Sequence, residues 1–122
     1  MSDQSHWKTC KSIIKWMPIG SRAVCNPAPK DTDDDRLILV RDVDFAIKFF
    51  EACGFVETTG EDYLGEDFRT MRRGELSFII STDPKFYERF RVATIACREL
   101  NVLDKEHRIA ICRAILYGGD HA

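Results

Sequence analysis

Acidic residues crowd into the positions directly ahead of one aliphatic run. Asp31, Asp33, Asp34 and Asp35 precede the run 37–40, whose consecutive aliphatic side chains suit a strand buried on both faces at the centre of a sheet. Side chains alternate along a strand, so Asp33 and Asp35 share one face and Asp34 lies on the other. Two adjacent carboxylates repel each other unless a cation lies between them, and a hard divalent ion such as Mg²⁺ is the natural occupant. The pattern predicts a cation site at Asp33 and Asp35, and a slipped register would place Asp31 or Asp34 there instead.

The acidic pair follows a turn-forming Gly20-Ser21 and a Pro-rich loop. This order, with Asp33-x-Asp35 leading into an apolar strand, resembles the nucleotidyltransferase signature of the DNA polymerase β superfamily. The resemblance implies that Gly20 and Ser21 hold a nucleoside triphosphate and that Asp33 and Asp35 bind the divalent metals, Mg²⁺ or Mn²⁺. It also implies a third metal-binding carboxylate from a neighbouring strand, for which Glu75 is the best match.

Nucleotidyl transfer requires an activated hydroxyl and a stabilised pyrophosphate leaving group, and two metal ions held by carboxylates supply both. Glycine lets backbone N–H groups approach phosphate oxygens closely, and the guanidinium of Arg22 suits phosphate. On this interpretation Asp33, Asp35 and Glu75 are the catalytic and metal-binding residues. Gly20, Ser21 and Arg22 are the nucleotide-binding residues.

A looser likeness covers more of the chain. The stretches 25–29, 83–87 and 115–118 resemble the small nucleotidyltransferase-like proteins encoded by tailed bacteriophages. This likeness implies a phage protein acting in the host cytoplasm.

Length and composition set broad limits. The 122 residues suit a single domain, 1–122, and 44% hydrophobic with 31% charged residues is the balance of a globular protein. No apolar run approaches the roughly 20 residues of a membrane span, and the first residues lack the pattern of a secretory signal, so we expect a cytoplasmic protein. Five scattered cysteines without a Cys-x-x-Cys indicate reduced thiols. The net charge of −2 argues against bulk attraction to nucleic acid, and we interpret the arginines of 69–91 as a solvated basic face.

Periodicity and turn signals predict the elements that position these residues. The fold class expected is α+β, with a mixed or antiparallel sheet flanked by helices in a minimal nucleotidyltransferase-like fold. The expected elements, in order, are a helix over 6–15, a strand over 16–19, a loop over 22–32, a strand over 37–40, a helix over 43–52 capped by Asp42, a short strand over 55–58, a loop over 59–67, a hairpin of 68–72 and 76–81, a helix from Asp83-Pro84 to about residue 101, and a helix from Asp104 to Gly118.

Three functions remain open at this level. The first is a metal-dependent nucleotidyltransferase that uses a nucleoside triphosphate and an unknown acceptor, namely RNA, a protein or a small molecule. The chain has little room for a module that selects the acceptor. Either a partner subunit or a homo-oligomer supplies it, or the Pro-rich loop and the last two helices hold the acceptor. The second is a catalytically inactive protein of the same fold that binds a host or phage macromolecule. The third is a nuclease with an acidic site, which would cleave nucleic acid without consuming nucleotide.

Overall fold

The computed structural model describes residues 3–25, 33–59 and 68–117. Its elements follow in the order η1 (a 3₁₀ helix, Asp3–Thr9), β1 (Ile13–Ile19), α1 (Ser21–Val24), β2 (Asp34–Val40), α2 (Val43–Ala52), β3 (Val56–Thr58), β4 (Arg69–Arg73), β5 (Leu76–Ser81), α3 (Pro84–Glu99) and α4 (Lys105–Tyr117). No helix among the described residues combines the length and the apolar character needed to cross a membrane.

The strands form one mixed sheet in the order β1-β2-β5-β4-β3. The central pair, β2 and β5, is parallel, whereas β1 with β2, β4 with β5 and β3 with β4 are antiparallel. The predicted α+β class is therefore confirmed, and of the two sheet types expected the mixed one is present. The run 37–40 is completely buried at the centre of the sheet, as its aliphatic composition predicted.

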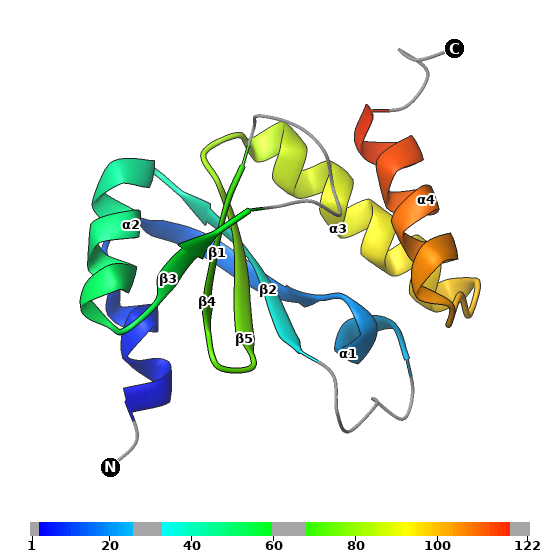
Figure 1. Ribbon diagram of the computed structural model, residues 1–122. Coiled ribbons are helices and arrows are strands. Elements are labelled where there is room, and N and C mark those ends of the chain that lie inside the picture. The colour runs from blue at the N-terminus through cyan, green and yellow to red at the C-terminus, as the bar shows by residue number, and fades with distance from the viewer. Residues whose placement is uncertain (1–2, 26–32, 60–67, 118–122) are drawn as a thin grey trace.

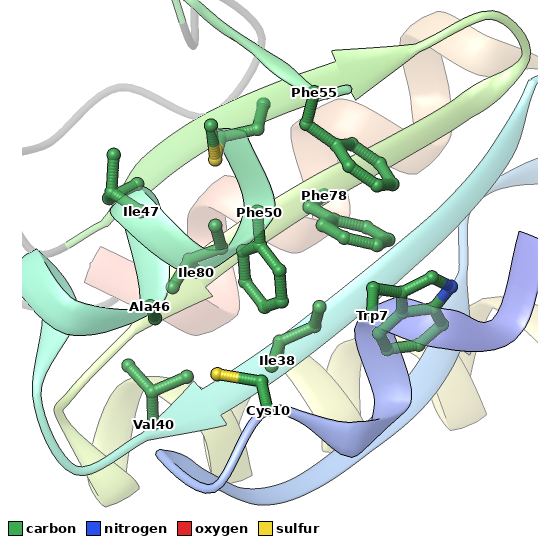
Figure 2. Packing of buried hydrophobic residues seen from close by; sticks show 11 residues of the cluster. Trp7, Cys10, Ile38, Val40, Ala46, Ile47, Phe50, Phe55, Phe78 and Ile80 are labelled. Carbon is green, nitrogen blue, oxygen red and sulfur yellow. The ribbon is translucent and has the colours of Figure 1, made fainter. Parts of the chain in front are cut away.

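Helices cover both faces of the sheet (Figure 1). On one face, η1 and α2 pack over Ile38, Val40 and Phe78, and on the other, α3 and the end of α4 pack over Leu37 and Leu39. Figure 2 shows the first of these cores, where Phe78 lies among the rings of Phe50, Phe55 and Trp7. Because β2 alternates between two apolar cores, its register is strongly fixed.

Local signals set the ends of several elements. Asp42 caps α2 by accepting a hydrogen bond from the Phe45 N–H, and Asp83 caps α3 by accepting one from the Lys85 N–H. The hairpin β4–β5 turns at Gly74, whose φ of +60° suits glycine. These predicted caps and this predicted turn are confirmed.

Two expectations about the first part of the chain are wrong. The helix expected over 6–15 ends at Thr9, and Ile13 already belongs to β1, where it is paired with Val40. Sheet pairing across the chain therefore overrides the local helical spacing. A loop was expected over 22–32. Its first residues instead belong to the single helical turn α1, and residues 26–32 lie outside the described residues.

Candidate functional site

The sheet topology brings the end of β1 to the starts of β2 and β5. Ile19 is paired with Asp35, Asp35 with Ser77, and Ser77 with Arg72, so these four side chains form one row across β1, β2, β5 and β4. Asp33 lies two residues before Asp35 and therefore belongs to the same face. The turn after β1 and the start of α1 lie beside the start of β2 in Figure 1. The predicted pair and the predicted Gly-Ser turn thus lie at one edge of the sheet.

Gly20 and the Asp35 carboxylate are in direct contact. A Cβ placed on Gly20 would lie 2.3 Å from Oδ2 of Asp35 and 3.2 Å from its Cβ and Cγ. Gly20 also has φ +74° and ψ −162°, a conformation that is essentially restricted to glycine. Both the conformation and the contact therefore require glycine at this position.

The carboxylate of Asp35 is partly buried, and none of the described residues compensates its charge by a hydrogen bond or an ion pair. Among the residues that the structure describes, no hydrogen-bond donor and no cationic group pairs with its oxygens. Burial, together with the neighbouring charges of Asp33 and Asp34, raises the pKa of Asp35 to about 6, against the weaker opposing effects of Arg72 and Lys105. The site therefore favours a proton or another cation on this carboxylate.

Asp33, on the same face, is already neutralised. The Arg72 guanidinium donates from Nη2 to Oδ2 at 2.7 Å and from Nη1 to Oδ1 at 3.1 Å, a bidentate pair. The hydrogen bond from Arg72 is the main cause that holds the pKa of Asp33 below its ordinary value. The pKa values of Asp33 and Asp35 are thus shifted in opposite directions although the two residues are near neighbours of the same type.

Asp34 lies on the opposite face of β2. Its carboxylate accepts hydrogen bonds from Arg36 at 2.7 and 2.9 Å, and Arg22 Nη1 is 3.9 Å away. The hydrogen bond from Arg36 is also the chief cause that lowers the pKa of Asp34. Asp34 therefore does not take the ligand position that a slipped register would give it, and Asp31, the other alternative, lies outside the described residues.

Glu75 lies at the same edge but points largely into solvent. Its backbone carbonyl accepts a hydrogen bond from the Asp34 N–H at 2.8 Å, and the residue lies in the turn directly before β5 rather than within the strand. That side chain is 79% exposed, and its Oε2 is 3.5 Å from Arg22 Nη2. Within the described ranges, no three side chains of the His, Cys, Asp and Glu types are grouped closely enough to hold a metal ion. Two carboxylates therefore share the face, while the third is nearby and paired with arginine.

Two basic residues at the site were not singled out from the sequence. Arg72 was placed in the solvated basic face of 69–91, yet it binds Asp33, and Lys105 at the start of α4 acts electrostatically on both Asp33 and Asp35. The register of the hairpin is the feature of the sequence that could have placed Arg72 near the acids, because it puts Arg72 across from Ser77, the strand partner of Asp35. Other arginines of the expected face also have individual partners, Glu57 for Arg69 and Glu88 for Arg91.

The sheet and its helices define the class of the fold, α+β with a mixed five-stranded sheet flanked by helices. The chain is similar in structure to one solved protein, the conserved protein GrpB from Enterococcus faecalis, with a TM-score of 0.61 over 93% of this chain and 86% of that one. The two sequences are 20% identical, so the likeness shows the fold alone. No protein-family model and no curated protein matches the chain.

Proposed function

We propose that this protein is a metal-dependent nucleotidyltransferase that moves a nucleoside monophosphate from a nucleoside triphosphate to a hydroxyl of an acceptor. The observation that supports this most directly is the Asp35 carboxylate, which is partly buried against Gly20 with no partner among the described residues. A carboxylate kept in this state destabilises the fold, which is typical of a group retained for binding or catalysis. The resemblance of the Gly20-Ser21 turn and the Asp33-x-Asp35 pair to the nucleotidyltransferase signature supports the same proposal.

The donor atoms of the site suit Mg²⁺ or Mn²⁺. Asp35 and Asp33 offer hard carboxylate oxygens on one face of β2, and burial together with the charge of Asp33 raises the pKa of Asp35, so a cation there would be stabilising. We assign these two residues as the metal ligands and Glu75 as a third ligand or a general base. When bound, the metal would supply charge neutralisation at the transferred phosphoryl group and lower the pKa of the attacking hydroxyl.

The phosphate side of the site is assigned to Gly20, Ser21 and Arg22. Gly20 carries no side chain at the point where the chain passes the acids, so backbone can approach a phosphate there. Arg22 is 31% exposed and lies within 4 Å of both Asp34 and Glu75, so its guanidinium is already held at this edge of the sheet. A guanidinium offers two parallel donors to phosphate oxygens.

The proposed acceptor is RNA, a protein or a small molecule, and a partner subunit or a second copy of the chain is the proposed source of any further acceptor-binding surface. The likeness to phage proteins, and the host cytoplasm that it implies, stay predictions.

The test is incorporation of labelled nucleotide from each of the four nucleoside triphosphates with Mg²⁺ or Mn²⁺, using the protein itself, RNA and a cell extract as acceptors. We expect incorporation by the wild type and a loss of at least about a hundredfold in Asp35→Asn. Asp34→Asn is the matched control. It removes the same negative charge from the residue directly before Asp35, whose side chain lies on the other face of β2. Equal incorporation by Asp35→Asn and the wild type would overturn the assignment of Asp35.

A second function is favoured by the arginine pairs. Arg72 neutralises Asp33, and Arg22 is close to Glu75, as expected for a scaffold whose acids are held by ion pairs. Such a protein would bind a host or phage macromolecule without catalysis. It would show neither nucleotide incorporation nor binding of Mg²⁺ with a nucleotide, which separates it from the enzyme. Nucleic-acid cleavage without nucleotide consumption would instead identify a nuclease.

A further inference from the structure

Arg72 reaches across one strand to the proposed metal ligands. It lies on β4 opposite Ser77 of β5, and Ser77 lies opposite Asp35 of β2. Its guanidinium forms the two hydrogen bonds to Asp33, and Nη1 also donates to the Gly74 carbonyl at 3.1 Å. The side chain therefore passes over β5 and ends between the hairpin turn and the acids.

The pair between Arg72 and Asp33 can be exchanged for other partners. The two side chains are 41% and 47% exposed, and exposed ion pairs contribute little to stability. The positive charge of Arg72 also acts on Asp35, so it lies near both carboxylates of the face. Arg72 thus supplies one positive charge at the place where the proposed metal would supply two.

We propose that Arg72 is a further nucleotide-binding residue, which pairs with Asp33 until metal and nucleotide arrive together and then binds the triphosphate. This inference rests on the proposed function. The Arg72 fork donates to both oxygens of Asp33, so a metal ion and the guanidinium compete for the same carboxylate. The released guanidinium remains at the site, and phosphate is the anion that its planar fork matches best.

The exchange makes binding of metal and binding of nucleotide depend on each other. Mg²⁺ alone must compete with Arg72 and leaves the guanidinium without its anion, so it binds weakly. Mg²⁺ with a nucleotide supplies a replacement anion for Arg72, so it binds more tightly. By linkage, each ligand raises the affinity for the other by the same factor.

The chain offers a matched control in the next residue. Arg73 has the same side chain but faces the other side of the sheet, where Nη1 donates to the Cys53 carbonyl at 2.7 Å and the guanidinium lies 4.8 Å from the centre of the Phe55 ring. Removing Arg73 changes the net charge of the hairpin equally without touching the acids. Arg72→Lys is a second useful variant, because it keeps the charge and loses the fork.

The experiment is calorimetric titration of the full chain with Mg²⁺ alone, and with a non-hydrolysable nucleoside triphosphate analogue at saturating Mg²⁺. For Arg72→Gln we expect Mg²⁺ alone to bind about fivefold more tightly, the effect of removing an exposed ion pair. We expect the analogue to bind roughly tenfold to a hundredfold more weakly, the effect of losing charged hydrogen bonds. Arg72→Lys should fall between, and Arg73→Gln should match the wild type.

The outcomes separate this inference from the proposed function. If the wild type binds Mg²⁺ and the analogue, and Arg72→Gln and Arg72→Lys bind both as the wild type does, Arg72 is only a surface ion-pair partner and the inference is wrong. If Arg73→Gln shows the same changes as Arg72→Gln, the effect is one of net charge and the inference is also wrong. If neither the wild type nor any variant binds Mg²⁺ or the analogue, the proposed function fails and the inference fails with it.

Discussion

Gly20 and Asp35 fit each other across the first two strands, since a methyl group on Gly20 would lie 2.3 Å from Asp35 Oδ2. Ile19, the residue before Gly20, is the strand partner of Asp35, so sheet pairing holds the turn against the carboxylate. The contact excludes any side chain at Gly20. One glycine therefore both shapes the turn and keeps the acid partly buried.

We predict that Gly20→Ala destabilises the protein by at least about 3 kcal/mol, because backbone strain and overpacking each cost about 1–3 kcal/mol. Gly74→Ala is the control: its φ is also positive, but nothing lies within 4 Å of the added Cβ, so we expect a loss of only about 1–2 kcal/mol. Urea denaturation measures both. In an Asp35→Ala background the loss caused by Gly20→Ala should shrink, and equal losses in both backgrounds would contradict the contact.

We predict that Asp35→Asn makes the protein more stable at neutral pH. The folded-state pKa of Asp35 is about 6, above its ordinary 3.8, so between these values the folded chain holds a proton that the unfolded chain releases. The contribution of Asp35 to the free energy of unfolding therefore falls as pH rises from about 4 to about 6 and is constant above. At its full extent the penalty is about 3 kcal/mol.

The measurement is urea unfolding of the wild type and Asp35→Asn at intervals from pH 4 to pH 8. The stability gained by the variant should grow between pH 4 and 6 and then level off. The lowered pKa values of Asp33 and Asp34 have the opposite effect on stability, because the stability that these two residues contribute is lost as pH falls. Both residues are present in the wild type and in Asp35→Asn, so their effect cancels in the comparison. A variant less stable than the wild type at pH 8 would show that Asp35 has a stabilising partner.

A third prediction concerns the core that supports the site. Phe78 is completely buried, with its ring centre 4.4 Å from that of Phe55 and 4.7 Å from that of Trp7. Phe78→Ala should lower the free energy of unfolding by about 3–5 kcal/mol, because it removes apolar contacts and leaves a cavity. Phe45→Ala, at a position that is 50% exposed, should cost less than about 1 kcal/mol in the same assay. Similar losses at both positions would contradict the placement of this core.

The elements predicted best are those whose signals are local. Asp42 and Asp83 cap their helices, and Gly74 turns the hairpin, because each effect acts within a few residues of the chain. The segment 10–15 was misassigned for the opposite reason. Its helical spacing is local, whereas the pairing of Ile13 with Val40 depends on a strand far along the chain.

The same contrast between local signals and long-range contacts applies to the candidate site. Strand alternation correctly predicted that Asp33 and Asp35 share a face and that Asp34 does not. Alternation says nothing about partners from other elements, so the sequence did not distinguish Asp33, which Arg72 neutralises, from Asp35, which has no partner in the described ranges. The same limit applies to Glu75, which was expected to share a strand face with Ser77 but lies in the turn before β5 with a largely exposed side chain.

A fourth prediction concerns the thiols, which are all free. Cys25 and Cys53 are partly exposed, whereas Cys10, Cys97 and Cys112 are buried. Burial raises the pKa of Cys112 to about 12 and also raises that of Cys97, so few thiolates form there. Alkylation of the native protein at pH 8, read by mass spectrometry, should modify Cys25 and Cys53 first. The unfolded protein serves as the control and should react at all five, and early modification of Cys97 or Cys112 would contradict the packing of α3 against α4.

The most direct test of Asp35 as a cation-binding group is the titration of Mg²⁺, with a non-hydrolysable nucleoside triphosphate analogue, into the wild type, Asp35→Asn and Asp34→Asn at pH 8. At this pH Asp35 is ionised, since its pKa is about 6. We predict that the wild type and Asp34→Asn bind Mg²⁺ and the analogue with similar affinity and that Asp35→Asn binds at least about tenfold more weakly. Unchanged binding by Asp35→Asn, or a loss confined to Asp34→Asn, would contradict this account of the site.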